Sequence, residues 1–231
     1  MIRSNAVFYT LFVGVLLFSG FVNSDTKTTD SNEKLVHLTS LEWPPYSGEQ
    51  LPDGGASIAL AKQAFKHMGY ELIVDFYPWS RAVYNGTNKN SRYAGYFPEY
   101  YSPKLADTLY FSNEIGDSPL GLIEHVSNPV EWQRLEDLQA YSLGVVRDYV
   151  NTQALDTAIA EGNQPAQEVT SDAQNIRKVA GKRIPLAVID PFVFDYLLLT
   201  DESLRFYRND VQMNSQLLEN KKLYICFQKT E

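Results

Sequence analysis

The sequence has one cysteine, Cys226, so no disulfide bond can form within the chain. It is also poor in basic residues, with 20 lysines and arginines against 28 aspartates and glutamates. The resulting net charge of −8 argues against nucleic-acid binding, which requires a basic face. Without disulfides the fold depends on its core, and 231 residues of 44% apolar composition are enough to build one.

Long hydrophobic runs are absent except for one near the N-terminus, residues 6–21. It follows a basic residue, Arg3, and precedes the small and polar residues 22–24. This order is typical of a signal peptide, so we expect residues 1–24 to be removed by cleavage after Ser24 and the protein to be exported to the periplasm. The alternative is an uncleaved anchor, but a run of about 16 residues is shorter than the ~20 that span a membrane. Residues 25–33 are polar and predict a flexible tether.

Beyond the tether, predicted strands alternate with predicted helices, which indicates an α/β fold with mainly parallel sheets. The predicted strands cover residues 34–40, 70–78, 92–98, 118–126, 141–146, 184–190, 204–207 and 222–228. The predicted helices cover residues 54–69, 79–88, 147–162, 171–182 and 191–200. Ser171 and Gln174 stand at capping-box spacing, and Asp190 before Pro191 is typical of a helix N-terminus.

The order of several motifs resembles that of bacterial periplasmic solute-binding proteins. They are "EWPPY" (42–46), "PWSRA" (78–82), "YSPKLADTLYFS" (101–112), "LEDLQAYSLGVVRDY" (135–149) and "LAVID" (186–190). The closest group is the family that includes polar amino acid receptors of ABC transporters, also described as extracellular solute-binding protein family 3. The resemblance runs from about Lys34 to the end of the sequence, and the order of the motifs carries it.

This resemblance implies a type II clamshell of two α/β lobes with a ligand between them. Lobe 1 would comprise residues 34–117 plus 207–231, and lobe 2 residues 118–206. The implied function is capture of a small polar solute, an amino acid or a related compound, by a monomer that delivers it to an ABC permease of the inner membrane. The alternative is a sensing subunit that reports the ligand to a membrane partner.

One departure from the family concerns the ligand. In the family a Thr-Pro-Glu-Arg segment supplies the arginine that grips an amino acid carboxylate. Here the segment is Ser102-Pro103-Lys104-Leu105, so the arginine position holds Leu105. Lys104 is nearby, but it is a point charge without the planar fork of arginine.

The loop after the first strand holds Glu42, Trp43 and Tyr46 around two prolines that restrict its backbone. Ligands of α/β proteins bind at the carboxyl ends of strands, so we expect these three residues to line the cleft. An aromatic plug over the core is the alternative. Trp79 and Arg81 follow the second strand at the same edge, and an ion pair with a neighbouring carboxylate is the alternative role for Arg81.

Arg147 follows one predicted strand and Asp190 another. An arginine beside a helix N-terminus makes a good anion site, so Arg147 is the best remaining candidate for a ligand carboxylate. The alternative is a surface arginine paired with Asp148. Asp190 resembles the family residue that meets the ligand ammonium, and it suits an N-cap equally well. Among the many tyrosines, whose rings suit sugars, aromatic groups or cations, we expect Tyr96 or Tyr100 in the site.

Catalysis lacks a reactive constellation in the sequence. His37, His67 and His125 do not have metal-ligand spacing, and no nucleophile elbow or phosphate-binding loop occurs. A carboxylate pair such as Glu42 and Asp190 leaves a periplasmic hydrolase as the remaining enzyme alternative. We therefore expect a binding protein that needs neither metal nor cofactor.

Overall fold

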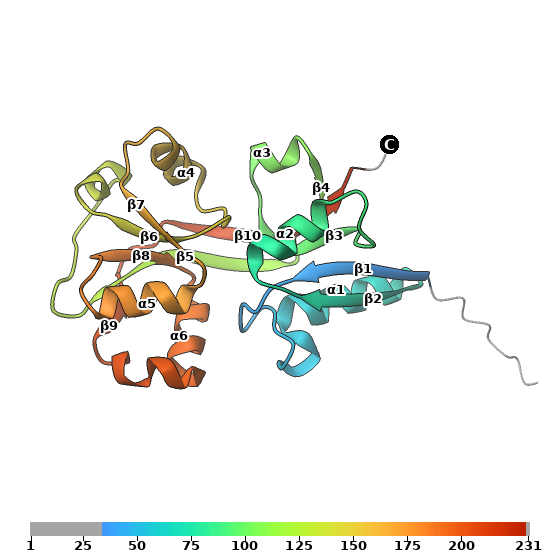
Figure 1. The fold of residues 1–231 in the computed structure, drawn as a ribbon, viewed down its shortest axis with the longest axis horizontal. Coiled ribbons are helices and arrows are strands. Elements are labelled where there is room, and N and C mark those ends of the chain that lie inside the picture. The colour runs from blue at the N-terminus through green and yellow to red at the C-terminus, as the bar shows by residue number, and fades with distance from the viewer. Residues whose placement is uncertain (1–33, 230–231) are drawn as a thin grey trace, which may run out of the picture. The chain divides into compact units, whose positions relative to one another are not determined.

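Strands and helices alternate along the part of the chain that the computed structural model describes, residues 34–229 (Figure 1). The predicted signal peptide and tether lie outside these residues. The strands are β1 (Lys34–Ser40), β2 (Tyr70–Phe76), β3 (Gly95–Tyr100), β4 (Leu109–Phe111), β5 (Gly116–His125), β6 (Leu143–Val146), β7 (Ala166–Val169), β8 (Leu186–Ile189), β9 (Val211–Met213) and β10 (Glu219–Gln228). The α-helices are α1 (Ala56–His67), α2 (Trp79–Thr87), α3 (Pro103–Ala106), α4 (Gln153–Ala160), α5 (Asp172–Ala180) and α6 (Pro191–Thr200). Three 3-10 helices are η1 (Pro52–Gly54), η2 (Leu135–Ala140) and η3 (Glu202–Tyr207).

The strands form one sheet in the order β2-β1-β3-β10-β5-β8-β6-β7, with β4 beside β10 and β9 beside β5. Strands β2, β1 and β3 are parallel, and so are β8, β6 and β7. Every residue of β3, β6 and β8 is buried, as is typical of parallel strands covered on both faces. We call β1–β4 the first half of the sheet and β6–β9 the second half.

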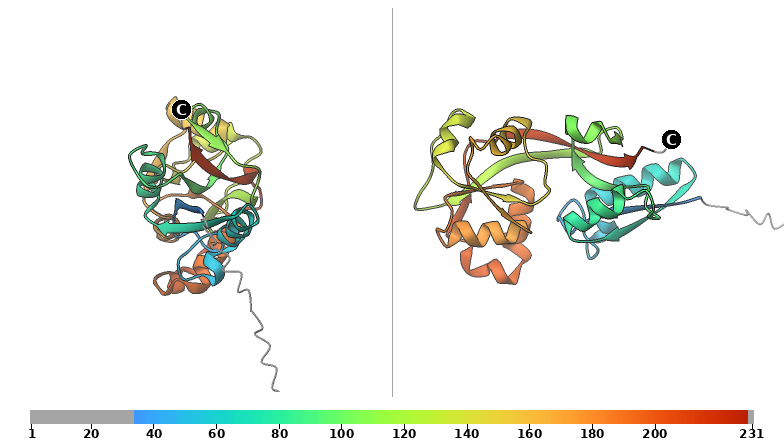
Figure 2. Two further views of the ribbon diagram at one scale, coloured as in Figure 1. Left: turned by 90° about the vertical axis from the view of Figure 1, so that its right-hand side faces the viewer. Right: turned by 45° about the horizontal axis from the view of Figure 1, so that its top comes forward.

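Two long antiparallel strands, β5 and β10, join the halves, and Figure 2 shows them side by side between the two groups of elements. β10 pairs with β5 near its start and with β3 and β4 near its end. β5 continues into the second half, where it pairs with β8 and β9. The predicted lobe boundary at residue 207 separates β9 from its partner in β5, so β9 groups with the second half by pairing.

A glycine allows the close approach of β3 to β10. A Cβ atom on Gly95 would lie 1.9 Å from the carbonyl oxygen of Cys226, so no other residue fits here without moving a strand. Cys226 itself is fully buried on β10, and burial raises the pKa of its thiol. The thiol is therefore protonated and packed in the core.

The structure corrects three details of the predicted elements. The helix predicted at 147–162 begins at Gln153, because Thr152 caps it and residues 147–152 run as a turn and a loop. The strand predicted at 204–207 belongs to η3, whose start is capped by the Asp201 side chain. The predicted capping box at Ser171 is not formed, because the side chain of Gln174 bonds Thr170 instead.

Candidate functional site

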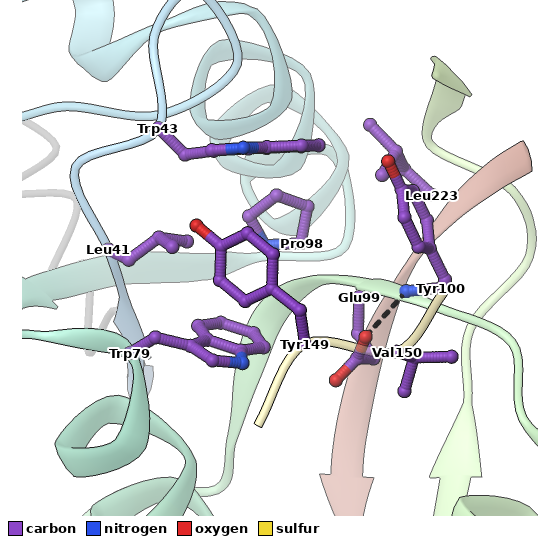
Figure 3. A pocket seen from close by; sticks show the side chains of 9 residues that line it. All are labelled: Leu41, Trp43, Trp79, Pro98, Glu99, Tyr100, Tyr149, Val150 and Leu223. Carbon is purple, nitrogen blue, oxygen red and sulfur yellow. Dashed lines mark hydrogen bonds between the residues drawn. The ribbon is translucent and has the colours of Figure 1, made fainter. Parts of the chain in front are cut away.

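A small cavity lies where the carboxyl ends of strands from both halves meet (Figure 3). The volume of the cavity is about 30 Å³, room for one or two water molecules. The lining residues are Leu41, Trp43, Trp79, Pro98, Glu99, Tyr100, Tyr149, Val150 and Leu223. Leu41 and Trp43 follow β1, Trp79 opens α2 after β2, and Tyr149 and Val150 follow β6. The lining is therefore mostly aromatic and apolar, with one carboxylate.

Backbone hydrogen bonds hold the loop after β1 in a single shape. The N–H of Trp43 donates to the carbonyl of Ser47 over 2.8 Å, and the N–H groups of Tyr46 and Ser47 donate back to the carbonyl of Trp43. Gly55 has a φ of 98°, and a Cβ there would lie 2.7 Å from the Tyr46 carbonyl. A glycine is thus needed to bring the start of α1 against the loop, which fixes the two aromatic residues.

Trp43 and Tyr46 stack on one another, with ring centroids 4.6 Å apart. Trp43 lines the cavity and meets the edge of Tyr100, whose centroid is 6.2 Å away. Tyr46 is not among the lining residues. Its hydroxyl donates to the Asp190 carboxylate over 2.8 Å, so this loop contacts the second half of the sheet.

Trp79 makes a second contact between the halves. Its indole N–H donates to the Asp148 carbonyl over 2.8 Å, and the neighbouring Ser80 hydroxyl donates to the Asp148 carboxylate. The Trp79 ring meets Tyr149 edge-on at 5.9 Å and Tyr96 at 5.5 Å. Tyr96 is fully buried beneath it and supports the indole rather than lining the cavity.

Glu99 is the carboxylate that lines the cavity, and only 5% of the residue is exposed. Its side chain accepts the Tyr100 N–H over 2.8 Å and the Tyr96 hydroxyl over 3.3 Å. Burial raises the pKa of Glu99 to about 8, because the charged form loses its hydration. The group therefore titrates near neutral pH.

Two more buried carboxylates flank the cavity from the second half. Asp172, at the start of α5, accepts the Tyr149 hydroxyl over 3.3 Å, and burial raises its pKa to about 7. Asp190 directly follows β8 and caps α6 by accepting the Phe192 and Val193 N–H groups. Burial raises the pKa of Asp190 too.

A hydroxyl chain connects Asp190 to the cavity wall. The Ser118 hydroxyl donates to Asp190 and hydrogen-bonds the hydroxyl of Tyr100, which lines the cavity. Ser118 lies on β5, so the chain crosses from the second half through a joining strand to β3. The N-cap expected for Asp190 is formed, and the same carboxylate also accepts the hydroxyls of Tyr46 and Ser118. Its contact with a ligand ammonium stays a prediction.

Three of the predicted site residues lie away from the cavity. Glu42 is exposed and accepts the Glu49 N–H within its own loop. Arg81 is exposed on α2 and is not among the lining residues. Arg147 pairs with Glu168 over 3.2 Å, with 55% of its side chain exposed. No helix N-terminus follows Arg147 directly, because α4 begins at Gln153.

Sequence reasoning missed Glu99, Tyr149 and Asp172. Glu99 was detectable as a lone charge within the otherwise uncharged strand "GYFPEY". Tyr149 stands two residues after Arg147 in a segment already expected at the cleft, where arginine chemistry received the weight instead. Asp172 follows β7, a strand that the sequence pattern did not reveal.

Residues 34–229 were expected to contain neither a metal site nor a membrane span. No group of three or more His, Cys, Asp and Glu side chains gathers there as a metal site. No helix in that range combines the length and apolar character of a membrane span.

No family model matches the sequence, and no curated protein matches it. Solved structures do match. A histidine kinase sensor domain with similarity to periplasmic binding proteins is 15% identical with a TM-score of 0.71, over 86% of this chain and 84% of that one. The GluR0 ligand-binding core of Nostoc punctiforme, in complex with L-glutamate, is 15% identical with a TM-score of 0.66, over 84% and 85%. The arginine-bound ArgBP of T. maritima is 14% identical with a TM-score of 0.62, over 84% and 88%.

These matches confirm the predicted fold class. The chain has the α/β fold of type II periplasmic binding proteins, and the resemblance read from the motifs holds over most of its length. The matched structures are ligand-binding proteins and sensor domains. At these identities the likeness concerns the fold, so the ligand must be argued from the cavity.

Proposed function

We propose that this protein binds a small polar solute, an amino acid or a related compound, between two lobes in the periplasm. The observation that carries the proposal is the cavity lined from both halves of the sheet, at the carboxyl ends of its strands. Ligands of open α/β folds bind at this edge, where the ends of several strands bring side chains together.

The proposed lobes correspond to the two halves of the sheet, with β5 and β10 as the hinge. The predicted division was residues 34–117 plus 207–231 against residues 118–206. Because β9 pairs with β5 at Ile123–His125, we extend the second lobe to include residues 207–218. A pair of strands that passes through both lobes can bend while its ends stay paired, which suits hinge closure.

The contacts between the halves suit a closed arrangement that opens to admit a ligand. The Tyr46 hydroxyl reaches Asp190, and the Trp79 indole N–H reaches the Asp148 carbonyl. Both bonds join the first half to turns of the second, so opening breaks them together. Each hydrogen bond contributes a net stability of only about 0.5–1.5 kcal/mol, so breaking both bonds to open the lobes costs little.

Small-angle X-ray scattering and calorimetry on the mature protein test this proposal. Calorimetry against a panel of amino acids and their amine derivatives should identify a ligand that binds with a 1:1 ratio. Scattering should then report a smaller radius of gyration at saturating ligand than without it. An unchanged radius with bound ligand argues for a rigid single domain, and binding of none of the panel argues against the proposal.

Delivery to an ABC transporter and sensing for a membrane partner both fit this binding role. Similar structures include an arginine-binding protein and a histidine kinase sensor domain, so the fold serves either. We favour delivery by a monomer that is exported with cleavage after Ser24. Edman sequencing of protein from the periplasm should begin at Asp25, and a deletion strain should lose uptake of the labelled ligand. Normal uptake with a lost transcriptional response would favour sensing.

A further inference from the structure

The residues that line the cavity have four aromatic rings, one buried carboxyl group and no basic side chain. We infer that the cavity binds an organic cation that has no carboxylate group, such as an amine or a guanidine. This inference rests on the proposed binding function and narrows its ligand class.

Four aromatic rings surround the space, from Trp43, Trp79, Tyr100 and Tyr149. They come from both halves of the sheet and approach one another edge-on, with centroids 6.2 Å apart for Trp43 and Tyr100 and 5.9 Å for Trp79 and Tyr149. Such rings present negative faces, which attract ammonium and guanidinium groups. Indoles are the strongest of these partners, and two of the four rings are indoles.

Buried carboxyl groups lie beside the rings and become negatively charged when they ionise. Glu99 lines the cavity, and Asp172 touches the lining through the Tyr149 hydroxyl, 3.3 Å from its Oδ2. Each is at least nine-tenths buried, so its charge has lost most of its water. A buried carboxylate is costly unless a cation or strong donors compensate it. A cationic ligand would supply that compensation when it binds.

Two basic groups from elements that contribute to the cavity are already engaged. The Arg147 guanidinium pairs with Glu168, and the Lys221 ammonium pairs with Glu219 over 3.2 Å. Lys221 also lies 5.5 Å from the centroid of the Tyr100 ring, on a strand beside the cavity. A ligand carboxylate would therefore meet Glu99, and no basic side chain among the lining residues would pair with it.

The space available also favours a compact head group. In Figure 3 the ring of Tyr149 appears between the indoles of Trp43 and Trp79. With a volume of about 30 Å³, the cavity in this conformation takes a head group and not a whole amino acid. A chain with a cationic end can place that end beside Glu99 while its remainder lies outside the cavity.

Matched ligands that differ by one carboxylate test the inference directly. Calorimetry on the mature protein should compare agmatine with arginine and cadaverine with lysine, since each pair shares its cationic end. Choline extends the test to a quaternary ammonium, whose nitrogen has no N–H to donate to Glu99. We expect at least one of the amines to bind about tenfold or more tightly than its parent amino acid, because the parent carboxylate faces Glu99.

Two variants separate a cation site from an anion site. Glu99→Gln keeps the shape of the side chain and should weaken amine binding about thirtyfold or more, the usual result of removing one desolvated charge partner. Lys221→Met removes the nearby ammonium and should leave amine binding unchanged or tighter. Circular dichroism and thermal melting check that each variant folds. If Glu99→Gln does not fold, Asp172→Asn provides a second carboxylate variant.

The possible failures are distinguishable. If arginine or glutamate binds as tightly as the amines, and Lys221→Met abolishes that binding, the site holds a carboxylate and the inference is overturned while the proposed function stands. If a neutral sugar binds and no amine does, the inference is overturned in the same way. If calorimetry finds no ligand in the whole panel, the proposed function fails and the inference fails with it.

Discussion

The connections after β8 and β6, both in the second half of the sheet, differ in where the next helix begins. After β8 the chain enters α6 at once, with Asp190 as the N-cap and Pro191 at the first helical position. After β6 the helix α4 begins only at Gln153, and residues 147–152 form the connection. The first turn brings a carboxylate against Tyr46, and the second brings an aromatic ring, Tyr149, into the cavity.

The difference comes from where each helix finds its cap. Asp190 supplies a cap directly after its strand, so its short side chain is fixed close to the sheet. Arg147 cannot accept the N–H groups of a helix, and Asp148 adopts a φ of 64°, which turns the chain away from a helix. Thr152 provides the cap instead, by accepting the Leu155 N–H. The residues between strand and cap are the ones available to contact the other half.

The largest expected effect of a single change is at Asp190. Asp190→Ala removes the cap of α6 and the acceptor for the hydroxyls of Tyr46 and Ser118. We expect the free energy of unfolding to fall by about 2–4 kcal/mol, since a lost cap and unpaired buried donors add. Urea denaturation measures it. Asp201→Ala is the matched control, because it removes the N-cap of η3 away from the cavity and should cost about 1 kcal/mol or less.

If Asp190→Ala and Asp201→Ala lower the free energy of unfolding equally, the hydroxyl chain at Asp190 does not stabilise the fold. Asp190→Asn sharpens the result, because its amide oxygen can still accept both capping bonds at Oδ1, whereas the hydroxyls of Tyr46 and Ser118 lose their acceptor at Oδ2. The free energy of unfolding of Asp190→Asn should lie between those of the parent and Asp190→Ala if the cap and the bonds to the two hydroxyls contribute separately.

The second expected effect is at Tyr149. Tyr149→Ala removes the edge-on contact with Trp79 and the hydrogen bond from its hydroxyl to Asp172. We therefore expect the free energy of unfolding, measured by thermal denaturation, to fall by about 2 kcal/mol. Tyr149→Phe keeps the ring and should lose only about 0.5–1 kcal/mol. Tyr84→Ala, an exposed tyrosine of α2, is the control and should change little. If Tyr149→Ala behaves like Tyr84→Ala, the ring does not support the contact between the halves.

The sequence was sufficient for the features that short-range patterns determine. The alternation of elements, the N-cap at Asp190 and the placement of Trp43 and Trp79 at strand ends all follow from periodicity, capping chemistry and chain order. The location of Arg147 was not accessible in the same way. Its pairing with Glu168 depends on β6 lying beside β7, a register that is formed between strands about twenty residues apart in the chain.

The third prediction concerns pH and contrasts Glu99 with an exposed acid. The pKa of Glu99 is raised to about 8 by burial, whereas it is near 4.5 in the unfolded chain. Between these values the unfolded chain is ionised while the folded protein keeps its proton, so unfolding releases a proton and stability falls as pH rises. The slope from one such group is at most about 1.4 kcal/mol per pH unit. Asp172, raised to about 7, contributes in the same direction over a lower range.

Glu99→Gln should remove the Glu99 part of this slope and make the protein without ligand more stable at pH 8 than the parent. Within the folded protein, Lys221 lowers and Asp156 raises the pKa of Glu99, and both act less than burial. Urea unfolding at pH 5, 6.5 and 8 measures the slope, with Glu49→Gln as the control at an exposed site. Parallel stability curves for the parent and Glu99→Gln would mean that the carboxylate is solvated.

The smallest expected effect is at Arg147, the residue that the sequence alone favoured as the partner of a ligand carboxylate. That prediction required a helix N-terminus directly after Arg147 and a guanidinium free to meet a ligand carboxylate. Neither condition holds, because α4 starts at Gln153 and the guanidinium pairs with Glu168. Both side chains of the pair are more than half exposed, so Arg147→Ala should change the free energy of unfolding by no more than about 0.5 kcal/mol.

The ligand affinity of Arg147→Ala should stay within about twofold of the parent, less than about 0.5 kcal/mol. Calorimetry with the tightest-binding ligand checks this, with Glu168→Gln as the matched variant that frees the guanidinium. A thirtyfold loss for Arg147→Ala alone would mean that Arg147 leaves Glu168 and reaches the ligand, and the cavity would then have to be assigned to an anion.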